Sequence, residues 1–579
     1  MSYRVITGKL TARTAFHIGS GEGNDLTDAP LRRDAEGQPF IPGTAIAGAL
    51  RALLTRLAPR LGSKPCVMLA KKRENRQKPC DCAACRLFGD VNPSNEKESK
   101  SAASRLLVFD ARPAGELPHP LIRDGVGIDR ITGAAARTGA VKFDLEVLPA
   151  GAEFELRLEL RNSPGEDTVG DEQLLAAGLA EWEAERLWLG GRVARGLGAF
   201  KLNDLQFKTL SLETSEQVLT FLKEDRPWQQ AEVQTGWLEE SLGFLKPTAC
   251  NDHSDAIARG WFFLTGVLQA EGALLTNDML ASGVSGFDHA PLLAQWGDWQ
   301  HPVLTGAGLR GVLRSHAERL ARTLATLQAA GKDDFLRRCP ACDPNARNND
   351  KQKPLPLESC DSLLKKAGVS GETAVGEDSL CLACRLFGSA RRGSRLLVED
   401  APYQQTERQP KPALKMLDFL AIDRFTGGGA EGAKFDALAL WQPTFTLRLH
   451  LDNPADWELG WLWLALRDLA AGWLTVGFGG AKGFGRVKLT DWTATFSCLL
   501  PEDAPGVMQL GLTAQKSGVY TTIQVTSVTE GWRALAQEWV NAFDKKVKGF
   551  SRPAEIKLTE DGYFGRLEQL YPVMKGGAQ

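Results

Sequence analysis

The chain has 579 residues, of which 43% are hydrophobic and 24% charged, and its formal net charge is −2. This composition is typical of a globular protein, and no apolar run approaches the roughly 20 residues that a membrane-spanning helix needs. A net charge near zero argues against a uniformly basic nucleic-acid binder. The first residues are no secretory signal, so we expect a cytoplasmic protein without a membrane partner. Residues 71–78 and 391–395 are locally basic, and either phosphate contact or simple solvation explains them.

Strands and helices are predicted in turn along the first part of the chain. Residues 3–16 are rich in β-branched side chains and predict a strand, which a glycine-rich acidic loop follows over residues 19–34. Apolar residues at steps of four, three and four predict a helix over residues 46–57. A second amphipathic stretch, residues 174–187, predicts a helix that leads through a glycine loop to a strand at residues 199–202.

The same landmarks return in the same order later in the chain. They are Cys-x-Ala-Cys-Arg-Leu-Phe-Gly (82–89 and 381–388), Ser-Arg-Leu-Leu (104–107 and 394–397), Ile-Asp-Arg-x-Thr-Gly (128–133 and 422–427), Lys-Phe-Asp (142–144 and 434–436) and a glycine loop (191–198 and 480–485). These ordered matches indicate two copies of one structural unit. We predict a first unit over 1–205, a linker over 206–258, a second unit over 259–499 and a C-terminal extension over 500–579.

Strands mixed with two helices in each unit predict an α+β fold with a ferredoxin-like (RRM-like) sheet and large insertions. The second unit is longer than the first between its first helix and the Cys-Arg-Leu-Phe-Gly segment, so its extra residues are expected around the cysteines. His316 lies on the apolar face of a predicted helix and is interpreted as a hydrogen-bonded core residue. The extension contains one amphipathic stretch, residues 532–547, that we expect to dock on a neighbouring surface.

Nine of the 11 cysteines fall into two groups at matching positions of the units. Cytosolic thiols stay reduced, so Cys-x-x-Cys pairs point to metal and not to disulfides. Four thiolates without a neighbouring histidine favour structural zinc over catalytic zinc. We predict one zinc on Cys66, Cys80, Cys82 and Cys85, and a second on Cys339, Cys342, Cys381 and Cys384, with Cys360 as an alternative to Cys342. Cys250 and Cys498 stand apart and are interpreted as buried small hydrophobes.

Each unit has a glycine loop between its second helix and its last strand, at residues 190–198 and 477–485. Glycine lets the backbone approach a phosphate closely, and the interleaved cations Arg192, Arg195 and Lys482 suit a polyanion. A turn that merely needs glycine is the alternative. The order helix–loop–strand is the reverse of a nucleotide-binding loop, which argues against an NTPase.

Together these segments resemble the RAMP superfamily, and within it the backbone subunits of type III CRISPR effector complexes. The residues that carry the resemblance are His17-Ile-Gly19, Ile41-Pro-Gly43, Arg86-Leu-Phe-Gly89, Ile128-Asp-Arg-Ile-Thr132 and Arg195-Gly-Leu-Gly198. The second copy matches except at the first segment, and Thr305 replaces the proline of the next. The resemblance covers residues 3–202 and 262–489, and two such units with zinc-type cysteines look like the fused double backbone subunit of type III-D complexes.

The resemblance implies tandem RAMP domains with thumb-like hairpins, a bound guide RNA, neighbouring effector subunits, and cleavage of guide-paired target single-stranded RNA. The family's catalytic aspartate lies in the loop after the first strand, before a small residue and proline, which here gives Asp28. In the second unit Asp288 stands one residue further from its proline, and strict alignment puts His289 at that position. Asp25 and Asp34 miss the spacing. A solvated loop aspartate is the alternative for both candidates.

RNA supplies its own nucleophile in the 2′-hydroxyl, so one carboxylate that binds Mg²⁺ or another divalent ion suffices for cleavage. The cations of the hairpins, like those of the glycine loops, are predicted to contact guide or target phosphates, and an ordinary surface charge is the alternative for each. The hairpin cations are Arg130, Lys142, Arg424 and Lys434.

Three other functions compete with target cleavage. A backbone subunit without cleavage activity would use the same fold. A processing endoribonuclease would trim precursor guide RNA with an early histidine, for which His17 is in the right region but has no counterpart in the second unit. A zinc-dependent hydrolase fails for lack of a histidine–carboxylate ligand set.

Overall fold

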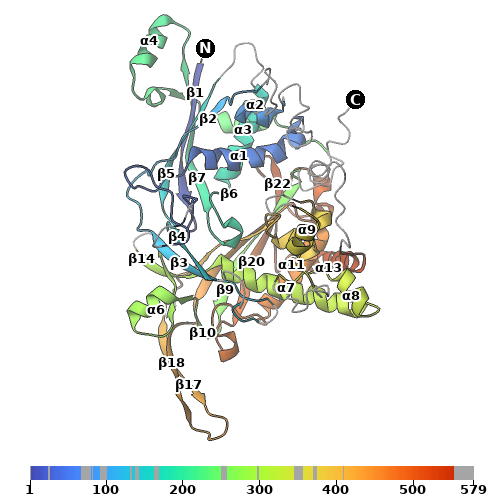
Figure 1. Ribbon diagram of the computed structural model, residues 1–579. Helices are drawn as coiled ribbons and strands as arrows, with labels where there is room; N and C mark the ends of the chain where they lie inside the picture. The colour runs from blue at the N-terminus through green and yellow to red at the C-terminus, as the bar shows by residue number, and fades with distance from the viewer. Residues whose placement is uncertain are drawn as a thin grey trace.

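The computed structural model describes residues 2–21, 23, 27–64, 66, 80, 82–90, 101–130, 133–136, 142–161, 169–249, 257–296, 299–344, 357–369, 375–407 and 410–552. Asp25, Cys250, the basic stretch 71–78 and the end of the extension after residue 552 lie outside these ranges. Among the described helices none is both long and apolar enough to span a membrane. Figure 1 shows two sheet-and-helix units arranged one above the other, with a hairpin that projects from the second.

The first unit is built on an antiparallel sheet with the strand order β2-β5-β1-β7-β6, and the small strand β8 extends it beside β7. Helices α1 and α3 pack together on this sheet, because Gly178 lets Leu50 and Leu54 approach α3 closely. The elements are β1 (Ser2–Ala12), α1 (Gly43–Leu57), α2 (Ala83–Phe88), β2 (Leu106–Val108), β5 (Glu153–Leu160), α3 (Val169–Glu183), β6 (Leu187–Trp188), β7 (Ala199–Ser211) and β8 (Glu232–Val233).

The second unit repeats this order as β15-β19-β9-β20, and β22 and β21 extend its sheet. Its elements are β9 (Gly260–Ala270), α7 (Gly306–Gln328), α10 (Leu382–Phe387), β15 (Leu396–Val398), β19 (Thr444–Asp452), α11 (Asp456–Ala470), β20 (Val487–Cys498), β21 (Gln515–Ser517) and β22 (Tyr520–Thr526). Even irregularities recur, since Asp204 and Asp491 have positive φ angles of 53° and 46° at matching bulges. The predicted duplication and the α+β class are therefore confirmed.

Each unit also carries a long hairpin, which fits the predicted thumb. The first hairpin pairs β3 (Leu121–Val126) with β4 (Lys142–Val147), and Asp124 lies opposite Asp144. The second pairs β17 (Leu414–Ile422) with β18 (Gly429–Trp441), and Asp418 lies opposite Asp436. The first hairpin lies against the second unit, whereas the second hairpin projects away from the molecule (Figure 1).

The insertions and connections contain further short elements. The extra length of the second unit lies in the longer helix α7 and in two added helices near the cysteines, as expected. These elements and the remaining ones are α4 (Ser215–Lys223), α5 (Trp237–Phe244), β10 (Ala273–Leu274), β11 (Asn277–Asp278), α6 (Met279–Ser285), β12 (Ala290–Pro291), β13 (Leu293–Trp296), β14 (Trp299–Leu304), α8 (Lys332–Arg338), α9 (Cys360–Lys366), β16 (Ala401–Pro402), α12 (Pro505–Met508) and α13 (Trp532–Lys548).

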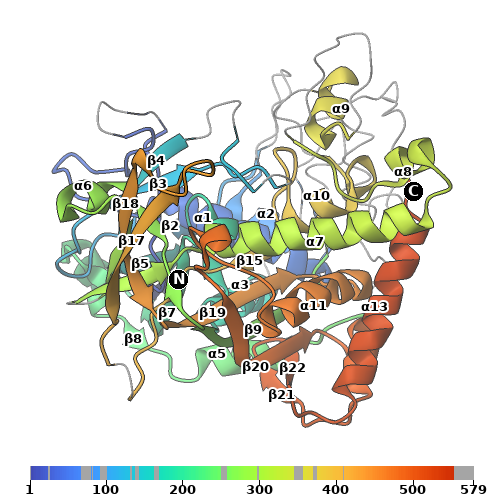
Figure 2. The same ribbon diagram turned by 90° about the horizontal axis from the view of Figure 1, so that it is seen from below.

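Packing contacts cross the predicted limits between each unit and the segment that follows it. Strand β7 continues to Ser211, and Trp237 of the linker stacks on Phe207 of β7 with ring centroids 4.2 Å apart. The amphipathic stretch of the extension forms α13, which lies along α11 of its own unit, where the rings of Trp461 and Phe543 stack at 5.2 Å. Figure 2 shows α13 beside α11, on the side away from the first unit's sheet. Linker and extension thus complete the two units.

The core histidine is confirmed. His316 is 8% exposed, and its Nε2 lies 2.6 Å from the carboxylate of Asp468. Cys498 is buried as predicted, and burial raises the pKa of its thiol to about 11.

Gly460 allows the close contact between α11 and α13, because a Cβ atom there would overlap the carbonyl oxygen of Trp539. We expect Gly460→Ala to lower the stability of the second unit by about 1–3 kcal/mol, as overpacked cores do. Gly311→Ala in α7 is the control, since its Cβ would meet no described atom within 4 Å. It should be neutral or stabilise by up to about 1 kcal/mol. Urea denaturation followed by tryptophan fluorescence compares the two, and equal midpoints would contradict the assigned contact.

Candidate functional site

Two aspartates of the first unit are joined by reciprocal hydrogen bonds, each from the main-chain N–H of one to the carboxylate of the other. The main-chain N–H of Asp28 donates to the carboxylate of Asp144 at 2.7 Å, and the N–H of Asp144 donates to Oδ2 of Asp28 at 3.1 Å. Bonds from the Asp28 N–H and the Thr27 hydroxyl lower the pKa of Asp144. Asp144 is therefore ionised at neutral pH. The loop after β1 and the hairpin thus present two carboxylates side by side.

The second unit forms the same pair. The N–H of Asp288 donates to Asp436 at 2.8 Å, and the N–H of Asp436 donates to Oδ2 of Asp288 at 2.9 Å. This geometry aligns Asp288, and not His289, with Asp28. The ring of His289 instead packs on Phe478 at 4.4 Å.

The sequence prediction did not include Asp144 and Asp436 among the site residues. A signal was present, because Lys-Phe-Asp is one of the repeated landmarks, but only its lysine was predicted to have a role at the site. The structure shows that the aspartate of each motif is the residue that meets the loop after the first strand.

Glu146 fastens the loop that carries Asp28 onto the first hairpin. Its carboxylate accepts from the N–H of Leu31 at 2.8 Å and from Arg33 at 2.6 Å, and its carbonyl oxygen lies 2.8 Å from Nδ1 of His17. His17 is only 8% exposed. Its ring supports the loop from inside the fold.

A cation from the glycine loop stacks beside each aspartate pair. Arg192 lies over the ring of Phe143 at 4.1 Å, and Lys482 lies over Phe435 at 4.0 Å. These phenylalanines precede Asp144 and Asp436 directly. The two cations come from different loop positions, since the loop's closing glycines align Lys482 with Arg195.

Backbone geometry explains this exchange of positions. Arg192 has a φ angle of 60°, a left-handed conformation that glycine adopts more readily, and Gly479 occupies the matching position with a φ of 78°. Keeping an arginine there costs about 1 kcal/mol or more. Both units therefore retain a cation over the phenylalanine, but they supply it from two different positions of the glycine loop.

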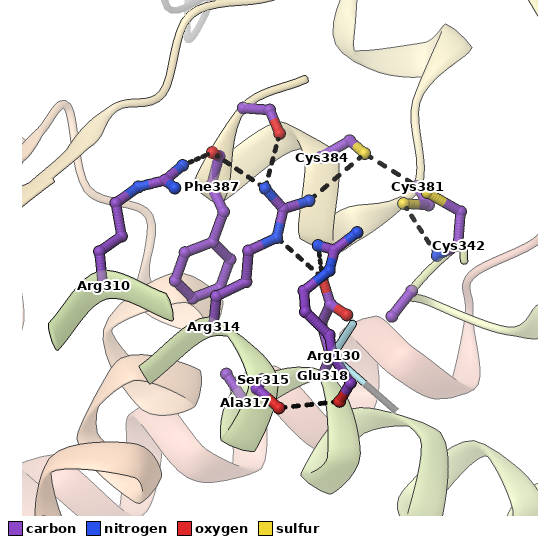
Figure 3. A network of polar contacts seen from close by, with 12 residues as sticks. Arg130, Arg310, Arg314, Ser315, Ala317, Glu318, Cys342, Cys381, Cys384 and Phe387 are labelled. Carbon is purple, nitrogen blue, oxygen red and sulfur yellow. Dashed lines mark hydrogen bonds and ion pairs between the residues drawn. The ribbon is translucent and has the colours of Figure 1, made fainter. Parts of the chain in front are cut away.

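The other predicted phosphate contacts divide into exposed and internal residues. Lys142, Arg195, Arg424 and Lys434 are exposed, and Lys434 lies 3.7 Å from Asp418. Arg130 differs, because its guanidinium pairs with the buried Glu318 of α7 and its carbonyl accepts from the hydroxyl of Ser315 at 2.9 Å (Figure 3). The charge of Arg130 is therefore used within the protein.

The first cysteine group converges as predicted. The sulfur atoms of Cys66, Cys80, Cys82 and Cys85 lie within 4.8 Å of one another, and the last three residues are buried. Four converging thiols without a histidine suit tetrahedral Zn²⁺. Arg51 of α1 donates to Cys85 Sγ at 3.6 Å and to the Gly89 carbonyl at 3.0 Å, which links the cysteine group to the helix.

The second cysteine group corrects one predicted ligand. The converging residues are Cys342, Cys360, Cys381 and Cys384, all buried and with sulfur atoms within 4.8 Å of one another. Cys339 is not among them, and its thiol donates to the carbonyl of Ala341 at 3.2 Å. Cys360 therefore replaces Cys339, and not Cys342 as the sequence had suggested. Figure 3 shows Arg314 directed at Cys384, in the position that Arg51 has in the first unit.

Comparison with known proteins gives matches to both units. Residues 9–201 and 290–488 match the model of the RAMP superfamily. The chain is similar to the CRISPR system Cms endoribonuclease Csm3 of Methanocaldococcus jannaschii, with 26% identity over 213 residues, or 35% of this chain and 79% of the relative. Csm3 of Mycobacterium tuberculosis is 29% identical over 221 residues, or 35% and 86% of the two chains. Csm3 of Methanothermobacter thermautotrophicus is 26% identical over 235 residues, or 36% and 87%.

Zinc analysis tests the corrected ligand set. We expect Cys360→Ala to remove about one zinc per chain, because three thiolates close the site poorly. Cys339→Ala is the matched control and should keep the wild-type zinc content, since its thiol lies outside the group. Inductively coupled plasma mass spectrometry of the purified variants measures both. Retained zinc in Cys360→Ala together with lost zinc in Cys339→Ala would reverse the assignment.

Proposed function

This chain belongs to the RAMP superfamily, and from that premise we propose that it is a backbone subunit of a type III CRISPR effector complex that cuts guide-paired target RNA. The supporting observation is the aspartate pair, built in the same way in both units from the loop after the first strand and the hairpin. The similar Csm3 proteins are named endoribonucleases, which supports the same chemistry.

The pair suits proton transfer and cation binding at a phosphodiester. Asp28 and Asp288 are exposed, so a strand laid along the sheet can reach them. An ionised carboxylate near a 2′-hydroxyl can accept its proton while the chain holds the phosphate in line. Carboxylate oxygens are the ligands that Mg²⁺ prefers, and Asp28 with Asp144, or Asp288 with Asp436, would hold a divalent ion that stabilises developing charge. We propose Asp28 and Asp288 as catalytic residues, and Asp144 and Asp436 as residues that position them.

Phosphate contacts would come from both sides of each pair. We propose Lys142, Arg192 and Arg195 for the first unit and Arg424, Lys434 and Lys482 for the second. Because base pairing with the guide selects the target, these side chains need to recognise only backbone and shape. The partners of the chain are then guide RNA, target RNA and neighbouring effector subunits, and its two cysteine groups would carry structural zinc.

Two other functions remain as outcomes of the test. A non-cleaving backbone subunit would bind RNA through the same cations and leave the aspartates without chemical effect. Precursor processing by His17 has less support, since this ring is buried beneath the glycine loop and its Nδ1 faces a carbonyl.

A cleavage map of the assembled complex tests the proposal. We expect Asp28→Asn and Asp288→Asn each to remove one target-RNA product, slowing that cut at least about a hundredfold, because each removes the proton acceptor of one unit. Asp144→Asn and Asp436→Asn should slow the same two cuts, respectively. Guide-loaded complexes and end-labelled target resolve the products.

Asp418→Asn is the control, since this exposed aspartate lies on the second hairpin directly opposite Asp436. All products should persist in this variant. Unchanged cutting in the Asp28→Asn, Asp288→Asn double variant would leave only the structural role.

Guide-RNA affinity tests the stacked cations. Arg192→Ala and Lys482→Ala should each weaken binding severalfold and lower the slope of log affinity against log salt by about one, because each removes one phosphate contact. Arg467→Ala is the control, because its side chain is 52% exposed on α11 and pairs with Asp468. Filter binding at several salt concentrations measures the slopes. Equal slopes for all three variants would contradict these contacts.

A further inference from the structure

The two units meet at a junction in which backbone touches backbone. A Cβ atom on Gly196 would lie 2.8 Å from the Cα of Gly306 at the start of α7. The N–H of Asp400 donates to the carbonyl of Gly196 at 3.2 Å. The glycine loop of the first unit is thereby docked on the α7–β15 face of the second.

Three sets of charged contacts fix this junction. Arg123 of the first hairpin pairs with Asp400 at 2.5 Å, and these side chains are 9% and 2% exposed. Arg130 pairs with Glu318 beside Ser315, as Figure 3 shows. The third set pairs two residues of the first unit with two of the second, namely Arg13 with Glu399 at 2.8 Å and Glu185 with Arg448 at 2.6 Å.

Within the residues that the structure describes, the repeat leaves one copy of each junction face without a docked unit. Gly43 starts α1 as Gly306 starts α7, and their N–H groups donate to Asp110 at 2.7 Å and to Asp400 at 2.9 Å. Beside Gly43 runs an open groove of about 400 Å³ between α1 and β2. Gly483 corresponds to Gly196, and a Cβ there would meet no described atom within 4 Å.

If a second copy of the chain docked here, its second unit would face the groove. The backbone of that unit matches the first unit, but its charged residues differ. The register of the two hairpins aligns Arg123 with Leu417. Arg13 and Glu271 follow matching strands and both bond the strand after the glycine loop, so the first cation becomes an anion. Glu185 corresponds to Gly472, which also has a positive φ.

The residues that flank the groove also differ from the matching residues of the second unit. Counting along the helices from Gly43 and Gly306 aligns Glu318 with Thr55 and Ser315 with Ala52. Counting from Asp110 and Asp400 aligns Glu399 with Phe109, and this ring is covered by Arg157, whose guanidinium lies 3.8 Å from the ring centroid. The ion pairs of the junction can therefore not form between two copies of the chain.

We propose that the groove beside Gly43 receives a RAMP-type unit of a different chain, one that offers an arginine to Asp110, and that copies of this chain do not join to one another. Asp110 is exposed and keeps the position that Asp400 uses to bind Arg123. Conserved backbone with altered charges is how related interfaces discriminate between partners. The inference rests on the duplication and not on RNA cleavage.

Restoring the missing pairs tests the proposal with the full chain as its own probe. Leu417→Arg restores the hairpin arginine, and the double variant Ala52→Ser, Thr55→Glu restores the groove's hydroxyl and carboxylate. We expect wild-type chain to stay monomeric in sedimentation velocity at about 50 µM, and the two variants to form a one-to-one complex when mixed. Their affinity should exceed that of wild-type pairs at least about tenfold, as a buried charge pair supplies.

Two results would overturn the proposal. One is head-to-tail association of the wild-type chain. The other is a mixture of folded variants that associates no better than wild type. Thermal midpoints and zinc content establish folding, and Leu417→Lys supplies the same charge if Leu417→Arg does not fold. RNA-free chain is used throughout, so failure of the cleavage proposal leaves this test unaffected.

Discussion

The buried ion pair between Arg123 and Asp400 holds the first hairpin on the second unit, and the first aspartate pair depends on it. Asp144 lies on that hairpin, so the place where it meets Asp28 is set by a contact with the other unit. Removing one partner of a buried pair costs about 3–5 kcal/mol, because the remaining charge stays desolvated. The second hairpin makes no such contact within the described chain and projects from it (Figure 1). The two aspartate pairs are thus alike in local geometry but unlike in support.

Duplication has preserved backbone geometry more strictly than charge. Matching bulges, glycines and main-chain bonds recur in both units, since a fold tolerates little change where backbone meets backbone. Charged residues at the faces diverge instead: Glu318 corresponds to Thr55, and Arg13 to Glu271. Arg192 and Lys482 show the opposite case, in which one cation is kept at different loop positions. Where a charge is retained despite backbone strain, its contact matters more than its place in the sequence.

The sequence was sufficient for features that repeat and insufficient for contacts between distant segments. Ordered motifs predicted the two α+β units, their helices and the first cysteine group. Cys339 was predicted in place of Cys360 because it forms a Cys-x-x-Cys pair with Cys342. Cys360 has no such spacing, and only the start of α9 brings its sulfur to the N–H of Cys381, at 3.2 Å. Arg130 looked like a surface cation because Glu318 lies far along the chain. The role of Asp144 could not be predicted, because it depends on which face of the hairpin meets the loop after β1.

The second cysteine group is connected to the junction and does more than brace an insertion. Arg314 donates to the Gly388 carbonyl at 3.1 Å and lies within 3.9 Å of Cys384 Sγ, while its Nε pairs with Glu318 at 2.8 Å. Glu318 in turn binds Arg130 of the first hairpin, so one series of contacts runs from the thiols to the other unit (Figure 3). In the first unit Arg51 contacts Cys85 in the same way. Thr55 stands there in the position of Glu318, so the first unit lacks the carboxylate that continues these contacts. Four thiolates around Zn²⁺ carry net negative charge that an arginine offsets, so zinc in the second unit would help to hold Arg314, and through it Glu318, where the first hairpin docks.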